Sequence, residues 1–334
     1  MIATHLLQAR CVPQRQAPAQ QCRRMGQSLQ WETDGAAWPH RAASRFVHAG
    51  GVRWHVQVLP GAALPAPAAG VSATAPGALW LLHGTGAASH SWRHLAPLLL
   101  DSGPVVVPDL PGHGFSSPLP AQQQSLAGMA AALAALAQAL ALPPVALIGH
   151  SAGAALAVQA VQDGLLAPAQ IIGINAALLP FDGLAGQVLG PIARWMSRQP
   201  LLPRLFAHSA RDGAAVRRLV RATGSQLDAS GLALYGQLIR SPAHVAGALA
   251  MMSDWDLRRL WRDLPRLPVP LSLLVGGQDG TVPPAQARLA AQRLPGTRHQ
   301  VLPGLGHLAH EEAAGVVAAA LQPWLPGLPQ AAVR

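Results

Sequence analysis

The run Val145-Ala146-Leu147-Ile148-Gly149-His150-Ser151-Ala152-Gly153 joins an apolar stretch to the pattern G-x-S-x-G. Its first four residues predict a buried strand, and the alanine-rich residues 152–163 predict the helix that follows. Glycines in such a pattern permit a tight turn from strand to helix, which projects the serine hydroxyl beyond the end of the sheet. The free N–H groups at the start of the helix favour negative charge that develops beside it. The sequence therefore predicts that Ser151 is a nucleophile.

Apolar strands and helices alternate on both sides of this turn. Because strands that are apolar throughout must be covered on both faces, the alternation predicts an α/β fold with a mostly parallel central sheet and helices on both faces. The expected strands are 79–82, 105–107, 145–148, 171–174, 271–275 and 299–302. The expected helices are 92–100, 125–141, 152–163 and 310–321. Residues 46–48 and 52–58 predict a β-hairpin that precedes them.

Three segments lie outside this alternation. Residues 1–40 predict a flexible N-terminal tail, and the Ala/Pro/Gly-rich residues 59–78 predict an exposed linker. Residues 179–262 are helical in character and carry eleven arginines. A structureless loop of that length would be unusual inside a compact domain. We therefore expect an inserted helical cap at 179–262, between the core segments 41–178 and 263–334.

The charge of the chain comes from arginine alone. All 24 basic residues are arginines, and they outnumber the 14 acidic residues to give a formal net charge of +10. The absence of lysine excludes Schiff-base chemistry, a phosphate-loop lysine and a serine–lysine dyad. It also argues against nucleic-acid binding, in which both basic residues usually share one patch. Acidic side chains are scarce, so few residues compete for the role of catalytic acid.

Cysteine placement and hydropathy bear on the location of the protein. Both cysteines, Cys11 and Cys22, lie in the first 25 residues and cannot form a disulfide framework for the core. We expect a cytoplasmic protein, with peripheral contact with the inner membrane as an alternative. The apolar residues 126–148 are interrupted by Gln138 and Pro143-Pro144, so they predict a helix followed by a strand rather than a membrane span.

A serine nucleophile needs a base, and the base needs an acid that orients it. These should follow in the order serine, acid, histidine. Asp279 stands just after the expected strand 271–275, and His307 stands after 299–302. Because loops at the carboxyl ends of parallel strands converge, these side chains can meet Ser151. Asp279 would hold the imidazole tautomer, and His307 would deprotonate Ser151 and later protonate the leaving group.

Other candidate residues fit these roles less well. Asp109 and His113 precede the serine, and we expect them to fix a loop by hydrogen bonds. Asp263 is the second choice for the acid, but it ends the insertion rather than a strand. His310, with Glu311 and Glu312, imitates part of a metal site without a complete ligand set. We therefore expect no metal and no cofactor.

An oxyanion loop is expected after the strand 79–82, at His83-Gly84-Thr85-Gly86. The backbone N–H of Ala152, with that of Thr85 or Gly86, would bind the anionic oxygen of a tetrahedral intermediate. The side chain of His83 is expected only to brace this loop.

Together, His83-Gly84, residues 109–114, the turn at Ser151, Asp279 and His307 resemble the α/β-hydrolase superfamily over residues 41–325. The resemblance implies the fold of that family with a serine nucleophile. The serine departs from the haloalkane dehalogenase and epoxide hydrolase branches, which have aspartate at this position. The sequence HGTG departs from the lipase and esterase branch with HGGG.

A narrower resemblance covers residues 31–312. The segments 38–47, 82–87, 149–154, 175–178, 223–225 and 244–252 are similar to the α/β hydrolases of purple-bacterial photosynthesis gene clusters, which are named magnesium chelatase accessory proteins of bacteriochlorophyll biosynthesis. This similarity implies a role near magnesium insertion into protoporphyrin, association with magnesium chelatase and a tetrapyrrole as the small-molecule substrate. The chain has no nucleotide-binding loop that could power the insertion of magnesium. The name of the family therefore indicates a pathway, and the residues indicate the type of reaction.

The cap is expected to select the substrate. Its arginines would pair with carboxylates, or form a solvated helix face. Met251, Met252 and Trp255 would line an apolar pocket, or belong to the cap core. Three functions remain open: a serine hydrolase of esters or acyl groups, a non-catalytic protein that binds a tetrapyrrole or the chelatase, and a hydrolase of carbon–carbon bonds or lactones.

Overall fold

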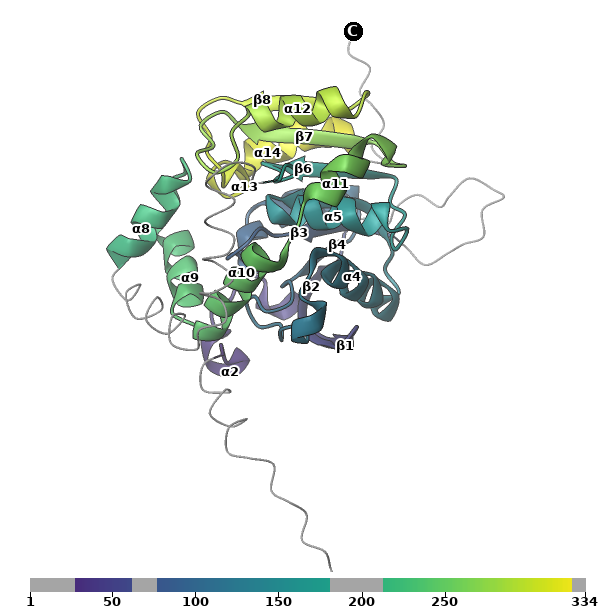
Figure 1. The fold of residues 1–334 in the computed structure, drawn as a ribbon. Helices are drawn as coiled ribbons and strands as arrows, with labels where there is room; N and C mark the ends of the chain where they lie inside the picture. The colour runs from purple at the N-terminus through teal and green to yellow at the C-terminus, as the bar shows by residue number, and fades with distance from the viewer. Residues whose placement is uncertain (1–27, 62–76, 181–212, 326–334) are drawn as a thin grey trace, which may run out of the picture.

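The computed structural model describes residues 28–61, 77–180 and 213–325, which are arranged around one eight-stranded sheet (Figure 1). The order of strands across the sheet is β1-β2-β4-β3-β5-β6-β7-β8. The strands are β1 (Ser44–Ala49), β2 (Val52–Leu59), β3 (Ala78–Leu82), β4 (Val105–Pro108), β5 (Pro144–His150), β6 (Gln170–Ile174), β7 (Leu271–Gly276) and β8 (Arg298–Leu302). β2 pairs antiparallel with β1 and β4, and all later neighbours are parallel. The predicted α/β architecture is confirmed.

Alternate side chains of the central strands enter two separate cores. In β3, Trp80 and Leu82 pack into one core, and Leu79 and Leu81 pack into the other. This follows from the two-residue period of a strand whose two faces are both covered. The helices over the first face are α4 (Leu126–Leu140), α5 (Ala152–Gln162), α11 (Arg258–Asp263) and α12 (Ala285–Arg293). Those over the second are α3 (Leu95–Leu98) and α14 (Ala314–Leu321).

Two of the expected helices are shorter than predicted. The helix expected at 92–100 is only the one-turn α3. It does not include Arg93, because Pro97 has no N–H to donate to the carbonyl of Arg93. That carbonyl accepts a hydrogen bond from Nε2 of His40 instead, at 2.8 Å. The helix expected at 310–321 is divided into α13 (Ala309–Glu312) and α14 by Ala313, whose φ is −144°. The helices expected at 125–141 and 152–163 are confirmed as α4 and α5.

The N-terminal tail was predicted to extend to residue 40, and this is wrong for its last ten residues. Residues Trp31–Asp34 form the short helix α2, and the ring of Trp31 contacts that of Phe115 edge to face. Trp38 is 3% exposed, and its Nε1–H donates to Ser89 Oγ at 3.1 Å. Burial of the Trp38 ring and packing of the partly buried Trp31 ring are the physical reason for order here. The part of the tail before residue 28 lies outside the described residues.

The insertion between β6 and β7 contains α8 (Gly213–Ala222), α9 (Ala229–Ile239), α10 (Pro242–Asp254) and α11 among its described residues. α8 and α9 lie beside the strand ends, away from the helices that cover the sheet (Figure 1). α11 was predicted as part of the cap, but its Leu260 is buried in the core beside α5, so the described part of the insertion rejoins the core before residue 263. Residues 181–212 of the predicted cap and 62–76 of the predicted linker lie outside the described residues.

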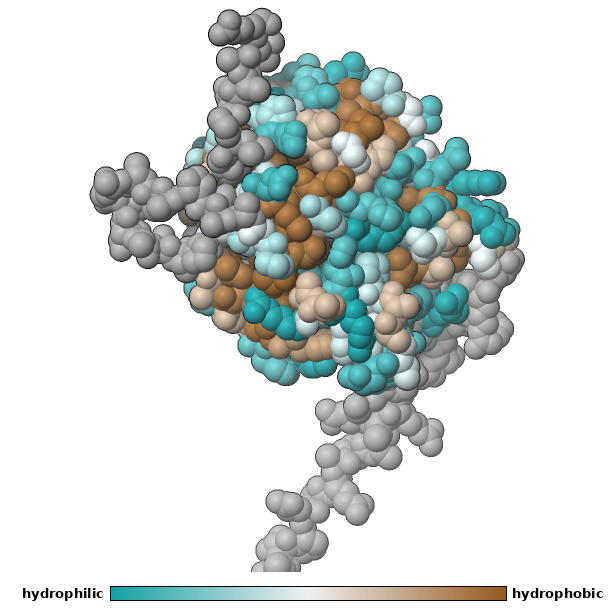
Figure 2. All heavy atoms as spheres, turned by 180° about the vertical axis from the view of Figure 1, so that it is seen from behind, coloured by the Kyte–Doolittle hydropathy of each residue, from teal (hydrophilic) through white to brown (hydrophobic). Residues whose placement is uncertain are grey.

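The outer surface mixes polar and apolar residues. Figure 2 shows the face turned away in Figure 1, where brown apolar residues are interspersed with teal polar ones. Among the described helices, none is long and apolar enough to cross a bilayer.

Candidate active site

Ser151 stands at a sharp turn between β5 and α5. Its backbone φ of 51° and ψ of −117° lie in a region that side-chain-bearing residues rarely adopt. Backbone hydrogen bonds of Ser151 hold the turn. The N–H of Ser151 donates to the carbonyl of Ile174 at 3.0 Å, and the carbonyl of Ser151 accepts from the N–H groups of Ala154 and Ala177. These hydrogen bonds fix the backbone of Ser151 and thereby the direction of its side chain.

The two glycines of the motif are required by close backbone contacts. A Cβ on Gly149 would lie 2.3 Å from the backbone nitrogen of Ala154. A Cβ on Gly153 would lie 2.1 Å from the carbonyl oxygen of Leu82 at the end of β3. The turn that exposes the serine thus depends on both positions having no side chain.

The predicted acid and base meet. Asp279 follows β7, His307 follows β8, and Nδ1 of His307 donates to Oδ2 of Asp279 at 2.8 Å. Both side chains are buried. The second oxygen of Asp279 accepts from the N–H groups of Thr281 and Val282 at 2.7 and 2.8 Å. Because Asp279 binds the Nδ1 proton, Nε2 of His307 keeps a lone pair with which to accept one.

Asn175 is a member of this site that sequence reasoning treated only as part of the family pattern. It follows β6 with a φ of 49°, a conformation that asparagine tolerates better than most residues. Its amide donates to Oδ2 of Asp279 at 2.6 Å and to the carbonyl of Gly306 at 3.4 Å. It therefore connects the acid to the loop that carries the base.

His150 directly precedes Ser151 and connects the turn that carries the serine to the loop that carries His307. Its Nε2–H donates to the carbonyl of His307 at 2.8 Å, and the two rings are 4.7 Å apart. Burial holds the pKa of His150 well below its ordinary value, so the ring is neutral and can act as this single donor. Among the described residues, none accepts or donates a hydrogen bond at the Ser151 hydroxyl.

The expected oxyanion loop packs directly against Ser151. A Cβ on Gly84 would lie 3.0 Å from Cβ of Ser151 and 2.8 Å from Nδ1 of His150. No described residue accepts a hydrogen bond from the backbone N–H of Thr85, Gly86 or Ala152, which leaves all three as donors.

His83 braces this loop, as expected. Its Nδ1–H donates to the carbonyl of Gly84, and its Nε2 accepts from the N–H of Leu110, both at 2.8 Å.

Helix α10 of the insertion closes over the same loop. Nε2–H of His244 donates to the carbonyl of Gly86 at 3.1 Å, and its Nδ1 accepts from the N–H of Gly114 at 3.0 Å. The Thr85 hydroxyl donates to the sulfur of Met251 at 3.0 Å. His244 had been noted only as part of the family pattern.

The three apolar residues expected to line the substrate pocket are placed differently from one another. Met251 is 2% exposed and contacts the oxyanion loop. Met252 is 61% exposed on the outer side of α10, and Trp255 packs partly buried against the core. Only Met251 therefore lies beside the oxyanion loop among the three.

The competing residues have structural surroundings. Asp109 accepts hydrogen bonds from Nδ1 of His55 and from the N–H groups of Ser89 and Phe115. Burial alone would raise the pKa of Asp109, but His55 and these donors hold it below its ordinary value. This confirms that Asp109 fixes a loop. Asp263 lies on the surface, where it pairs with Arg262.

His310 lies in the core rather than in a polar site. Its ring is 4.6 Å from that of Trp92 and 4.4 Å from that of His150, and burial lowers its pKa to about 3. Within residues 28–61, 77–180 and 213–325, no three His, Cys, Asp or Glu side chains are arranged to hold a metal ion. Cys11 and Cys22 are outside these ranges.

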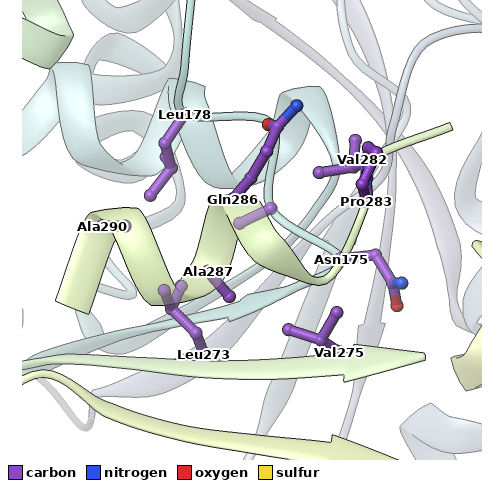
Figure 3. A pocket seen from close by; sticks show the side chains of 10 residues that line it. Asn175, Leu178, Leu273, Val275, Val282, Pro283, Gln286, Ala287 and Ala290 are labelled. Atoms are coloured by element: carbon purple, nitrogen blue, oxygen red, sulfur yellow. The ribbon is translucent and has the colours of Figure 1, made fainter. Parts of the chain in front are cut away.

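A small cavity lies behind the acid loop, between the ends of β6 and β7 and helix α12 (Figure 3). It is lined mainly by apolar side chains, with Leu178, Val275 and Ala287 around it and Asn175 at one side. At about 10 Å³ it has room for about one water molecule. It does not include Ser151, so it is not a substrate site for that residue.

Comparison with known proteins agrees with the fold described above. A family model described as "Alpha/beta hydrolase family" matches residues 81–320. The chain is 38% identical over 292 residues to the "Magnesium-chelatase 30 kDa subunit" of Rhodobacter capsulatus, which covers 87% of this chain and 98% of that protein.

Solved structures share the fold at lower identity. An α/β hydrolase fold protein from Burkholderia ambifaria superposes with a TM-score of 0.67 at 22% identity, over 84% of this chain and 97% of that one. A thermophilic esterase from Thermogutta terrifontis superposes with a TM-score of 0.62 at 23% identity, over 84% and 98%.

Proposed function

The chain belongs to the α/β-hydrolase family, and on that premise we propose that it is a serine hydrolase of ester or acyl substrates. Ser151 is the nucleophile, His307 the general base and Asp279 the residue that orients the base. The observation that carries the proposal is the buried Asp279–His307 hydrogen bond at the carboxyl end of the sheet that presents Ser151.

The first half of the reaction forms an acyl-enzyme. Ser151 Oγ attacks the carbonyl carbon of the substrate while its proton passes to Nε2 of His307. The carbonyl oxygen becomes an oxyanion, which accepts from the N–H of Ala152 and from that of Thr85 or Gly86. When the carbonyl re-forms, the bond to the leaving oxygen breaks, and His307 gives its proton to that oxygen. The alcohol departs with the proton that Ser151 lost.

The second half returns the enzyme to its starting state. A water molecule attacks the acyl carbon and gives a proton to His307, and a second oxyanion forms in the same place. Its collapse breaks the bond to Ser151 Oγ, which takes the proton back from His307. The acid leaves. Asp279 keeps its charge throughout and stabilises the imidazolium that forms twice per turnover.

Ester hydrolysis by variants tests the assignment of roles. The substrates are a series of p-nitrophenyl esters. We expect the wild type to hydrolyse them, and we expect Ser151→Ala to hydrolyse them no faster than buffer alone. Asp279→Asn should lower kcat by about 10³–10⁴-fold, because the imidazole loses the tautomer that accepts the proton. Asp263→Asn is the matched control. It removes the same charge from Asp263, the second candidate for the catalytic acid, and should leave kcat unchanged. Equal rates for the wild type and Ser151→Ala would refute the proposal.

A second candidate function is accessory to magnesium chelatase, in which the chain binds the chelatase or a tetrapyrrole. The likeness to the Rhodobacter capsulatus protein named as a chelatase subunit favours it. Exposed apolar residues offer a contact surface, with Leu98 on α3 and Val316 on the adjacent α14. Size-exclusion chromatography with the other magnesium chelatase subunits would show a complex if this role is correct, whether or not Ser151 is intact. Separate elution at micromolar concentrations would count against it.

A further inference from the structure

The segment Thr223-Gly224-Ser225 lies in the insertion, in the turn between α8 and α9. It is remote in sequence from the acid and base loops but contacts both. The carbonyl oxygen of Thr223 accepts from the N–H of Gly280 at 3.1 Å and from the N–H of His307 at 3.2 Å. One oxygen therefore joins the residue after Asp279 to the base itself.

Ser225 extends this contact along the base loop. Its side chain is buried, and its Oγ accepts from the N–H of Leu308 at 2.8 Å. The N–H of Gly306 is held by Oε1 of Glu312 at 2.9 Å, while Oε2 of Glu312 accepts from the N–H of Gln226 at 3.2 Å. The N–H groups of residues 306, 307 and 308 thus all donate to this assembly of the 223–226 turn and Glu312.

Gly224 allows the backbones to approach this closely. Its φ is +81°, and a Cβ there would lie 1.9 Å from the carbonyl oxygen of Gln278, which precedes the acid. In return, a Cβ on Gly306 would lie 2.3 Å from the carbonyl oxygen of Gly224 and 2.5 Å from Ser225 Oγ. The turn and the two loops are in backbone contact, and no other residue type fits at either glycine without displacement.

From these contacts we infer that Thr223-Gly224-Ser225, with Glu312, is a clamp that positions the Asp279–His307 pair. This inference rests on the proposed function of that pair. The acid and the base are carried by loops of two different strands, and the clamp fixes one loop relative to the other at three successive N–H groups. Its hydrogen bonds go to backbone N–H groups of the two loops, and not to Ser151 Oγ or the ring of His307, so its residues are positioning residues. The insertion is thereby coupled to the geometry of the base, beyond any part it has in selecting the substrate.

The rate of Ser151 modification by a fluorophosphonate tests the clamp. Ser225→Ala removes the acceptor for Leu308 N–H, and the maximal modification rate should fall about tenfold, as for loss of one buried hydrogen bond. The probe concentration that gives half the maximal rate should not change, because no binding contact is lost. A role limited to stability would lower the fraction of protein that reacts and leave the rate of the reacting fraction unchanged. Ser230→Ala, at an exposed serine on the next helix, is the matched control.

Glu312→Ala is the second variant, should Ser225→Ala not fold. It removes the acceptors for Gly306 and Gln226 near the surface, and it should slow modification to a similar extent at an unchanged half-maximal concentration. Wild-type maximal rates in both variants, or in Glu312→Ala alone if the other does not fold, would overturn the clamp and leave the proposed function intact. Failure of wild-type protein to be modified at Ser151 would instead overturn the proposed function, and the clamp with it.

Discussion

At the scale of single residues, Ser151, the proposed nucleophile, has a backbone conformation that is unfavourable for a residue with a side chain. Its φ of 51° belongs to a region that glycine enters freely and other residues enter at a cost of about 1–3 kcal/mol. The hydrogen bonds of its N–H and carbonyl enforce that conformation. The protein therefore pays in stability for the placement of one hydroxyl.

Ser151→Gly should stabilise the folded protein. Relief of the backbone conformation is expected to raise the free energy of unfolding by about 1 kcal/mol, after the greater freedom of glycine in the unfolded chain is subtracted. Urea unfolding monitored by tryptophan fluorescence measures this. Ser151→Ala removes the same hydroxyl but keeps a Cβ, so it should show little of the gain. An equal gain in both variants would mean that the hydroxyl, and not the backbone, is the source of the cost.

The side chains proposed to carry the chemistry could be selected from the sequence, whereas the residues that support them could not. Asp279 and His307 were proposed because each follows an apolar strand in the required order after Ser151, and the structure places the two side chains in contact. Asn175 also follows an expected strand, 171–174, but its amide cannot serve as the acid or the base, and Ser225 follows no strand. Asn175, at a positive φ, donates to Asp279, which is 104 residues away, and Ser225 accepts from the N–H of Leu308, which is 83 residues away. No local pattern specifies such distant partners.

At the scale of elements, α10 is tied to the oxyanion loop as closely as the 223–225 turn is tied to the base. His244 accepts from Gly114 and donates to the carbonyl of Gly86, which requires a neutral ring. Burial lowers its pKa to about 4, which keeps the ring neutral at physiological pH. The insertion therefore contacts both halves of the candidate site.

His244→Ala should weaken both stability and catalysis. Two partly buried backbone groups lose their partners, at about 1 kcal/mol each in the free energy of unfolding. Hydrolysis of p-nitrophenyl esters should fall at least about tenfold, because the donors of Thr85 and Gly86 are no longer fixed. Met252→Ala, at an exposed position of the same helix, is the control and should change neither quantity. A wild-type rate in folded His244→Ala would show that α10 does not position this loop.

Predicted elements were accurate in the sheet and less so at its periphery. Strands such as β3 are apolar at every position, so their burial on both faces could be inferred directly. α11 was assigned to the cap because residues 179–262 break the alternation of apolar strands and helices, although Leu260 anchors it in the core. The N-terminal residues lack periodicity, and only the packing of Trp31 and Trp38 shows that they belong to the folded body.

At the scale of the whole molecule, buried neutral histidines dominate the response to acid. The pKa of six of them is lowered by burial, and they are His83, His90, His113, His150, His244 and His310. Glu311 acts in the opposite direction, because burial raises its pKa to about 7. It is held by Arg93 and by the hydroxyl of Tyr235, which joins α9 to α13.

These groups predict that the protein loses stability as pH falls from about 6.5 to about 4. In that range the unfolded chain binds protons on the histidines that the folded chain excludes, so the free energy of unfolding rises with pH. His244 alone accounts for about 3 kcal/mol, from a pKa lowered to about 4. Glu311 binds a proton in the folded state between about 4.5 and 7, but one such group does not offset six. Urea midpoints of unfolding should therefore increase from pH 4.5 to pH 7. Midpoints that stay constant or fall over this range would contradict the conclusion that the buried histidines are neutral in the folded protein.

The most direct test of the central claim is to locate the site of covalent modification. Folded wild-type protein is treated with a fluorophosphonate and digested, and its peptides are mapped by mass spectrometry. The structure predicts one adduct, on the peptide that contains Ser151, and none in Ser151→Ala. Absence of an adduct from the folded wild type, or an adduct on another residue that persists in Ser151→Ala, would contradict a serine hydrolase built on this site.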